Sequence, residues 1–371
     1  MPRRLSQRMQ EALAAYLFLL PFGLSLLIFF GYAFVRSIYF SFTDYNMFDP
    51  PNWVGLANYA AIFRETRFLT ALRNSIGFSL IVTVSQTAFA LLLAVVLNAR
   101  IRGIAFFRTA YYMPSVASSV VVTLIFLWAF QRTGLFNYLL GLFRTYWPML
   151  LAFLVLAALF QVLQVLWDRR RGHPARWLEP GAVLTSLLLA AAGVAALWAT
   201  GRLTPVETEP VRIVWLNTRR TIPEGGGWFS LPLPLISIMM LNTWTTAPTF
   251  MLLYLAGLQD IPKELYEAAA VDGANRWQQF RYVTLPQLKH ITFLVMALGL
   301  IGTLQMFDQV AVIGSAAPLD SVITLAYYVY SNVFPGGALP RVGMASAAAV
   351  ILAILTLIAV LIQRRVVEGN D

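Results

Sequence analysis

Residues 261–286 read IPKELYEAAAVDGANRWQQFRYVTLP, a charged and amphipathic stretch between two apolar segments that are each long enough to cross a bilayer. Pro262 suits the first turn of a helix, because its missing N–H would have no partner there. Good helix formers follow, and Gly273 can end the helix in the left-handed conformation. Asn275 can cap a second short helix, which Pro286 is expected to stop. The stretch therefore predicts a helix–turn–helix elbow that lies on the membrane surface and presents a small knob to the water.

The composition is that of a polytopic membrane protein. Of the 371 residues, 59% are hydrophobic and only 12% are charged, which is about half the usual share of a soluble domain. The net charge of +10 could indicate a nucleic-acid partner, but the arginines are spread through loops between apolar segments, and the positive-inside rule explains them more simply. Cysteine is absent, which excludes a disulfide framework and a thiolate metal site.

Eight stretches pass the length test of roughly 20 apolar residues for a spanning helix. They cover residues 12–35, 76–97, 114–130, 147–166, 181–198, 233–258, 291–313 and 344–362. The short segments that carry positive charge at high density fall on one side, and they are 3–8, 100–108, 169–176, 263–289 and 364–365. This bias predicts cytoplasmic N- and C-termini and a cytoplasmic elbow. Arg3, Arg4 and Arg8 precede an apolar run that is longer than a signal-peptide core, so a retained signal anchor is expected.

The elbow carries a residue pattern at fixed offsets. It consists of Glu267-Ala268-Ala269, Gly273, Val283 and Leu285-Pro286. This pattern resembles the EAA loop of binding-protein-dependent importer permeases of the ATP-binding cassette (ABC) class, with Val283 at a position where that family usually has Ile. An ordinary interfacial amphipathic helix needs only one apolar face and one polar face, and it would carry no fixed pattern.

The resemblance implies a coupling role for one group of residues. In that family the loop sits in a cleft of a cytoplasmic ATPase and converts nucleotide-driven closure into movement of the membrane helices. The residues expected to do this here are Glu267, Ala268, Ala269, Asp272 and Gly273.

The same resemblance implies an all-α, polytopic integral membrane protein with about eight transmembrane helices, namely the six-helix core of importer permeases plus an inserted helical hairpin. Residues 1–145 are expected to hold the N-terminal half of the core with three transmembrane helices. Residues 146–230 would hold the inserted hairpin and an extracytoplasmic loop, and 231–371 the C-terminal half with the coupling loop. Residues 41–63 look like the segment after the first helix in sugar-importer permeases of the maltose and glycerol-phosphate type. Lipid-facing packing is the default role of the hairpin, and 201–230 is a candidate docking surface for a solute-binding protein.

The resemblance also implies a set of partners. The chain would pair with a second permease, two copies of an ATPase and an extracytoplasmic solute-binding protein in the inner (cytoplasmic) membrane, in contact with lipid and without nucleic acid. The dipeptide Gly-Lys does not occur, so the sequence has no P-loop, and a separate subunit would bind ATP and Mg²⁺ and hydrolyse the ATP. The chain itself is therefore expected to be no enzyme and to hold no cofactor or metal.

A permease needs a polar lining inside an apolar shell, because a polar group at membrane depth is costly unless it faces protein, water or substrate. The candidate residues are polar or aromatic and lie in three of the predicted spans. They are Ser115 and Ser119 in the third span, Asn242, Trp244, Thr245, Thr246 and Thr249 in the sixth, and Thr303, Gln305 and Asp308 in the seventh. Hydroxyl, amide and aromatic groups suit a sugar or related polyol, which the resemblance implies is moved inward by alternating access.

Other roles are open for these residues. The serines and threonines could pack between helices or bond back to the preceding turn. Asn242, Gln305 and Asp308 could form interhelical hydrogen bonds, and Trp244 could be packing rather than stacking on a sugar ring. A rival function is an ion- or proton-coupled secondary transporter that uses Asp308 as its carrier site, which leaves the elbow unexplained. A membrane enzyme is disfavoured, since no nucleophile, metal cluster or paired acid shares a loop.

Overall fold

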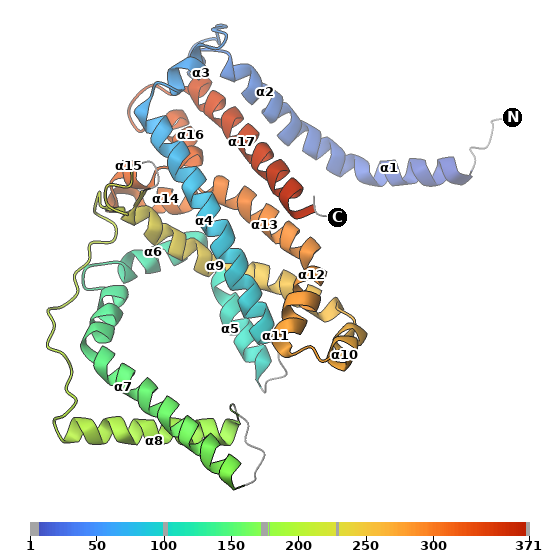
Figure 1. Ribbon diagram of the computed structural model, residues 1–371. Helices are drawn as coiled ribbons and strands as arrows, with labels where there is room; N and C mark the ends of the chain where they lie inside the picture. The colour runs from blue at the N-terminus through green and yellow to red at the C-terminus, as the bar shows by residue number, and fades with distance from the viewer. Residues whose placement is uncertain (1–6, 99–102, 172–176, 178, 228–229, 369–371) are drawn as a thin grey trace. The chain divides into compact units, whose positions relative to one another are not determined.

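The computed structural model describes residues 7–98, 103–171, 177, 179–227 and 230–368 (Figure 1). Its regular structure in these residues is helical apart from two short antiparallel strands, β1 (Thr221–Ile222) and β2 (Leu231–Pro232). The predicted all-α class is therefore confirmed. Contacts divide the chain into two compact units, Met1–Phe126 with Leu216–Asp371, and Leu127–Trp215, which are described in turn. Arg3 and Arg4 and the positive segments 100–102 and 172–176 lie outside the described residues.

The first unit begins with a long apolar run of three helical elements. They are α1 (Gln7–Ser25), the π-helical η1 (Leu26–Gly31) and α2 (Tyr32–Ser41), which follow one another without a break. The span Met9–Ser41 has 33 residues, and its most apolar window has 0% of its residues buried. A helix that is apolar all round and uncovered by other protein is suited to lipid. This run contains the predicted first span.

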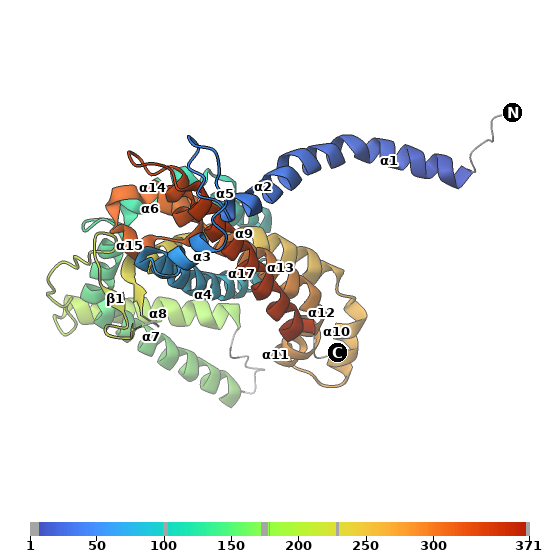
Figure 2. The ribbon, with the colours of Figure 1, turned by 90° about the horizontal axis from the view of Figure 1, so that it is seen from above.

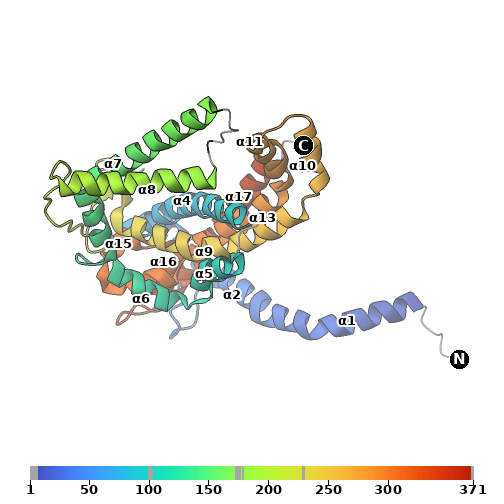
Figure 3. The ribbon, with the colours of Figure 1, turned by 90° about the horizontal axis from the view of Figure 1, so that it is seen from below.

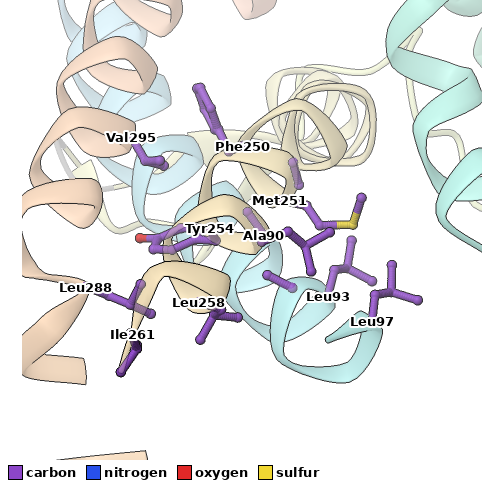
Figure 4. Close-up of a cluster of buried hydrophobic side chains, with 13 residues drawn as sticks. Ala90, Leu93, Leu97, Phe250, Met251, Tyr254, Leu258, Ile261, Leu288 and Val295 are labelled. Atoms are coloured by element: carbon purple, nitrogen blue, oxygen red, sulfur yellow. The ribbon is translucent and has the colours of Figure 1, made fainter. Parts of the chain in front are cut away.

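Three helices form the centre of the first unit. They are α4 (Thr66–Leu97), α9 (Leu233–Asp260) and α13 (Lys289–Leu304), and each packs against the other two. Ala90 and Leu93 of α4 are buried in the same cluster as Met251 and Tyr254 of α9 (Figure 4). Gly257 lets α9 approach α13 closely, because a Cβ at this position would collide with Ile291. Close van der Waals packing of this kind holds helices together where no water is available to drive burial.

The last helix, α17 (Val342–Glu368), packs with several other elements of the first unit. They are α2, α3 (Ala57–Ile62), α13 and α16 (Leu325–Val333). Figure 2 shows α3 beside α17. Gly343 is required here, since a Cβ on it would collide with the backbone oxygen of Thr43. The chain reaches α16 from α13 through α14 (Asp308–Ile313), the 3₁₀-helical η4 (Gly314–Ala316) and α15 (Leu319–Val322).

The third predicted span is not a single straight helix. Over the described residues, six helices are long and apolar enough to cross a membrane, or up to seven if one bent pair counts as a single span. The pair is α5 (Ile104–Val116) and α6 (Ser119–Ala129), bent by 98°. Pro114 lies in the last turn of α5, and the Ser115 hydroxyl bonds back to the carbonyl of Tyr112 at 2.7 Å. Proline and back-bonding serine are recurrent causes of such breaks.

Two further spans differ from a simple apolar helix. α9 contains the predicted span 233–258 and has 28 residues, about 42 Å at 1.5 Å per residue, but it is not one of the six or seven. Its polar residues, Asn242 and the threonines after it, lower its apolar content. The predicted helix 291–313 is interrupted, because α13 ends at Leu304 and α14 begins at Asp308. The predicted total of about eight is thus approximate.

The second unit is a helical hairpin. α7 (Leu135–Arg170) and α8 (Pro180–Ala199) lie side by side and contain the predicted fourth and fifth spans (Figure 3). The Ser186 hydroxyl donates to Gln161 Oε1 at 2.8 Å, which ties the two helices. The expected boundary between residues 145 and 146 falls inside α7, and the division of the chain into three parts stays a prediction.

Asn137 holds the segment after the hairpin against the start of α7. Its side chain is buried, and its Nδ2 donates to the carbonyl oxygens of Ile213 and Arg132 at 2.9 and 3.0 Å. The indole N–H of Trp215 donates to Asn137 Oδ1 at 3.0 Å. One buried amide therefore holds residues 213–215 against the start of α7, and its hydrogen bonds satisfy the buried polar group.

Candidate functional site

The elbow has the predicted two-helix form. α10 (Lys263–Val271) is followed by α11 (Arg276–Gln279), the π-helical η3 (Phe280–Thr284) and α12 (Leu285–Gln287). Pro262 is the N-cap residue of α10, so it lies one position before the helical turn in which it was predicted.

The glycine that ends α10 adopts the conformation that the sequence indicates. Gly273 has a φ of +83°. Its N–H donates to the carbonyl oxygen of Ala270 at 3.0 Å, and the N–H of Ala274 donates to that of Ala269 at 2.8 Å. These two bonds satisfy the last carbonyl groups of α10, which a left-handed residue makes possible.

Asn275 caps α11 as predicted, and it does so reciprocally. Its Oδ1 accepts from the N–H of Gln278 at 3.0 Å, while Gln278 Oε1 accepts from the N–H of Asn275 at 2.7 Å. Pro286 was expected to stop this second helix, and the helical run from Arg276 ends one residue later, at Gln287, before α13 begins at Lys289. A proline has no N–H to donate to the carbonyl group four residues earlier, and its ring clashes with that group. The π-helical η3, which ends at Thr284 two residues before Pro286, has the wider turn in which this carbonyl group lies.

Both arms of the elbow are anchored on the central helices. Ile261 and Leu288, at its two ends, are buried in the cluster that contains Tyr254 (Figure 4). Between the arms, the hydroxyl groups of Tyr266 and Thr284 form a hydrogen bond of 2.9 Å. The elbow is therefore a shaped extension of α9 and α13.

The residues predicted to couple to an ATPase lie on the open surface of the elbow. Neither α10 nor α11 has a buried residue. Glu267, Ala268, Asp272 and Gly273 are exposed, and Ala269 is half-buried.

Large apolar side chains lie on the same surface and were not among the predicted coupling residues. Val271, Trp277 and Tyr282 are 88%, 70% and 72% exposed. Their spacing in the sequence fits a helix face that packs against the protein as well as one that faces water. Only the structure shows that these side chains are exposed.

A polar cavity of about 260 Å³ lies within the first unit, where α5, α6, α9 and the start of α14 meet. Seven of the predicted pathway residues line it. They are Ser115, Ser119, Asn242, Thr245, Thr246, Thr249 and Asp308. The break between α5 and α6 and the break before α14 bring these segments together, so the two interruptions of the predicted spans shape the cavity.

Hydrogen bonds link the helices around the cavity. The Ser119 hydroxyl at the start of α6 donates to Asp308 Oδ2 at the start of α14. Asn242 Nδ2 donates to Gln309 Oε1 at 3.2 Å. Thr245 instead bonds back to its own helix, at 3.1 Å from the carbonyl oxygens of Leu241 and Asn242. Both roles foreseen for these residues, lining and local bonding, thus occur side by side.

Three predicted pathway residues do not line this cavity. Thr303 is buried and bonds to the Ser79 hydroxyl at 2.9 Å, which joins α13 to α4. Gln305 is exposed in the break after α13. Trp244 is 44% exposed, and its ring lies 5.4 Å from that of Phe126.

Gln309 and Thr123 line the cavity and were not predicted. Gln309 is 5% exposed and faces Asn242. Gln309 lies four residues after Gln305, so an unbroken helix would place both side chains on one face. The break at 305–307 separates them instead, and it leaves Gln305 exposed while Gln309 lines the cavity. The sequence signals for Gln309 were this spacing and its place next to Asp308.

The described residues contain no group of three His, Cys, Asp or Glu side chains that could hold a metal ion. The polar groups that line the cavity are hydroxyls, amides and one carboxylate. These groups can accept and donate hydrogen bonds to a polyhydroxylated solute.

The chain matches a protein family over its second half and individual relatives over nearly its whole length. The model of a family described as binding-protein-dependent transport system inner membrane component matches residues 179–369. The chain is 26% identical over 360 residues to the probable ABC transporter permease protein YurN of Bacillus subtilis (strain 168), with 96% of each chain covered. It is 28% identical over 354 residues to the arabinooligosaccharides transport system permease protein AraP of the same organism, with 94% of this chain and 87% of the relative covered.

A solved structure has a similar fold. It is the crystal structure of a bacterial ABC transporter involved in the import of the acidic polysaccharide alginate. The TM-score is 0.64 at 20% sequence identity, with 98% of each chain covered.

Proposed function

Because the chain belongs to the family of binding-protein-dependent transport system inner membrane components, we propose that it moves a sugar or related polyol inward as the permease subunit of an ATP-driven importer. Family membership confirms the resemblance drawn from the elbow, and the protein is a multi-pass membrane protein. The rival prediction, a secondary transporter using Asp308 as a carrier site, has no support from the family or the relatives. The relatives that are named for a solute include permeases for arabinooligosaccharides and lactose, which supports a carbohydrate here.

One observation carries the mechanism: α9 reaches from the cavity to the elbow without interruption. Thr249 lines the cavity, and α9 continues to Asp260, after which Ile261 and Pro262 lead directly into α10. The twelve residues from Thr249 to Asp260 make eleven helical steps, which span about 17 Å at 1.5 Å per step. A helix of this length is stiff, so a force on the elbow moves the cavity wall.

The expected partners follow from this arrangement. An ATPase subunit that binds ATP and Mg²⁺ would grip the exposed surface of α10 and α11 through Glu267, Ala268, Ala269, Asp272 and Gly273. Val271, Trp277 and Tyr282 would supply apolar contact area at that interface. A second permease would complete the pathway, and a solute-binding protein would deliver the solute from outside. The elbow and both termini would lie on the cytoplasmic side.

Alternating access describes the proposed cycle. Closure of two ATPase subunits would bring the elbows of the two permeases together and open the cavity outward. The solute would then meet the hydroxyl and amide groups of Asn242, Thr246 and Thr249 before release to the cytoplasm.

Co-purification tests the coupling role. The full chain, tagged and purified from its native membrane, is expected to bring an ATPase with it. Glu267→Lys should release that ATPase, because it reverses a charge on the proposed contact surface. Glu264→Lys is the matched control, since it makes the same change on the same exposed helix outside the predicted coupling residues.

Retention of the ATPase by Glu267→Lys and Gly273→Pro alike would contradict the proposed contact. So would vectorial solute uptake by the isolated chain in vesicles that contain no ATPase.

A further inference from the structure

The cavity between α5, α6, α9 and α14 carries one formal charge. Asp308 is an acidic lining residue, and every other described residue that lines the cavity is uncharged. The lining includes hydroxyl groups from α5, α6 and α9, with the amides of Asn242 and Gln309. The rest is apolar.

No cationic side chain in the described part of the chain neutralises the negative charge of Asp308. Its carboxylate accepts a hydrogen bond from the Ser119 hydroxyl, and among the described residues it has no ion pair with a lysine, arginine or histidine. Asp308 is half-buried and faces the cavity, so its free carboxylate oxygen remains available to a solute. A carboxylate in this position repels an anion and attracts a cation, and the effect is stronger in a cavity walled by apolar helices than in bulk water.

The two amides beside it cannot compensate. Asn242 Nδ2 donates to Gln309 Oε1, so the amide pair spends one donor and one acceptor on itself. The remaining amide and hydroxyl groups of the lining can either donate a hydrogen bond to a solute hydroxyl group or accept one from it. Such a lining recognises polyhydroxyl compounds without favouring an anion.

We propose that Asp308 sets the charge selectivity of the pathway, so that the cavity accepts uncharged and positively charged saccharides and rejects acidic ones such as uronates. This inference rests on the proposed function, because it assumes that a saccharide passes through this cavity. It narrows the substrate class and assigns the discrimination to one side chain.

The absence of cysteine allows a direct test on the full chain. Thr249→Cys places a single thiol on an exposed position of the cavity wall. Its rate of modification is measured with three methanethiosulfonate reagents, which carry a trimethylammonium group, a sulfonate group or no charge. Each rate is divided by that of the same reagent with free 2-mercaptoethanol.

The normalised rate for the cationic reagent, divided by that for the anionic reagent, is expected to be about 10. A nearby negative charge raises the local concentration of the cationic reagent and lowers that of the anionic one. Adding Asp308→Asn should bring the ratio close to one, and Asp308→Glu should preserve it. Asp320→Asn is the matched control, because Asp320 is an exposed carboxylate outside the cavity lining and its loss changes the net charge equally. Thr204→Cys, in the other unit, is the reference thiol.

A second arm uses sugars of one size. Glucosamine, glucose and glucuronate at equal concentration should protect Thr249→Cys from the uncharged reagent in decreasing order, and Asp308→Asn should remove the order. A ratio near one in the parent Thr249→Cys chain overturns the proposal even if the Asp308→Asn chain does not fold. An unchanged ratio in Asp308→Asn also overturns it, as does a thiol that no reagent reaches. None of these measurements uses ATP or an ATPase, so their failure is separate from a failure of the coupling test.

Discussion

The hydroxyl oxygens of Tyr266 in α10 and Thr284 in η3 lie 2.9 Å apart, so one hydrogen bond joins the two arms of the elbow. Thr284 is buried, and Tyr266 packs against the cluster that holds Ile261 and Leu288. This hydrogen bond therefore restrains the elbow in the absence of a partner. If the elbow is the proposed ATPase contact, a restrained elbow would transmit movement to α9 and α13 that a loose one would absorb.

Tyr266→Phe is expected to loosen the elbow without removing its packing. The buried Thr284 hydroxyl would keep only a long contact of 3.5 Å with the carbonyl oxygen of Gln279. Loss of one hydrogen bond of this kind costs about 1 kcal/mol, or roughly fivefold in local opening. Hydrogen exchange of the α10 and α11 amides measures this opening. Tyr282→Phe is the control, because that exposed hydroxyl makes no hydrogen bond within the described residues, and equal exchange in both variants would contradict the prediction.

Gly343→Ala is expected to destabilise the contact between α17 and the loop that follows α2. An added Cβ would meet the backbone oxygen and carbon of Thr43, and backbone atoms cannot move aside as a side chain can. Overpacking of this kind costs about 1–3 kcal/mol and should lower the Tm of the purified chain. Gly302→Ala in α13 has no atom within 4 Å of the new Cβ and should leave the Tm unchanged or raise it. Equal Tm values for the two variants would show that the contact is looser than described.

Gln86→Met is expected to raise the Tm. Gln86 is 0% exposed in α4, and neither its Oε1 nor its Nε2 has a hydrogen-bond partner among the described residues. Methionine has a similar volume and removes an uncompensated polar group, whose burial costs about 1–3 kcal/mol. Thr303→Val should do the opposite, because it breaks the bonds to Ser79 and Thr83 and leaves both hydroxyls buried. A lower Tm for Gln86→Met would mean that the amide is satisfied by water in solution.

The buried contact of Tyr328 predicts that the stability of the fold decreases at alkaline pH. Tyr328 lies in α16, outside the helices that could span a membrane, and its hydroxyl donates to Glu65 Oε2 at 2.5 Å. Burial raises the pKa of Tyr328 above its ordinary value, and the hydrogen bond and charge of Glu65 raise it further. The folded state therefore favours the neutral phenol. Its contribution to stability is complete below the unfolded pKa of about 10 and is lost as the pH rises above that value.

Thermal unfolding between about pH 8 and pH 11 measures this effect. Tyr328→Phe should lower the Tm at pH 8, because Glu65 loses a partner, and should make the Tm fall less steeply above pH 10. Tyr327→Phe is the neighbouring control and should keep the parent slope. A parent Tm that stays constant to pH 11 would refute the prediction.

The elbow was the part most open to sequence reasoning, because its signals are local. Gly273, in the left-handed conformation, and the capping residue Asn275 form their hydrogen bonds with residues three or four positions away. The backbone geometry at these two positions therefore follows from the local sequence. The apolar spans are also visible in the sequence, because a long apolar run must be covered by lipid or protein whatever the rest of the fold is. Pro286 shows the precision of such signals, because the helical run that it was expected to stop ends one residue beyond it, at Gln287.

The cavity depended on tertiary structure. The sequence places polar residues in three predicted spans. Helical spacing predicts which of these residues share a face only if each span is one unbroken helix. The breaks at 117–118 and 305–307 turn Ser119 toward Asp308 and bring Gln309 to Asn242, while Thr303 stays in the packing against α4. Local sequence signals fix which segments are apolar and where a short helix starts. Which polar side chains share one space is decided by where long helices bend, and that depends on packing between residues far apart in the chain.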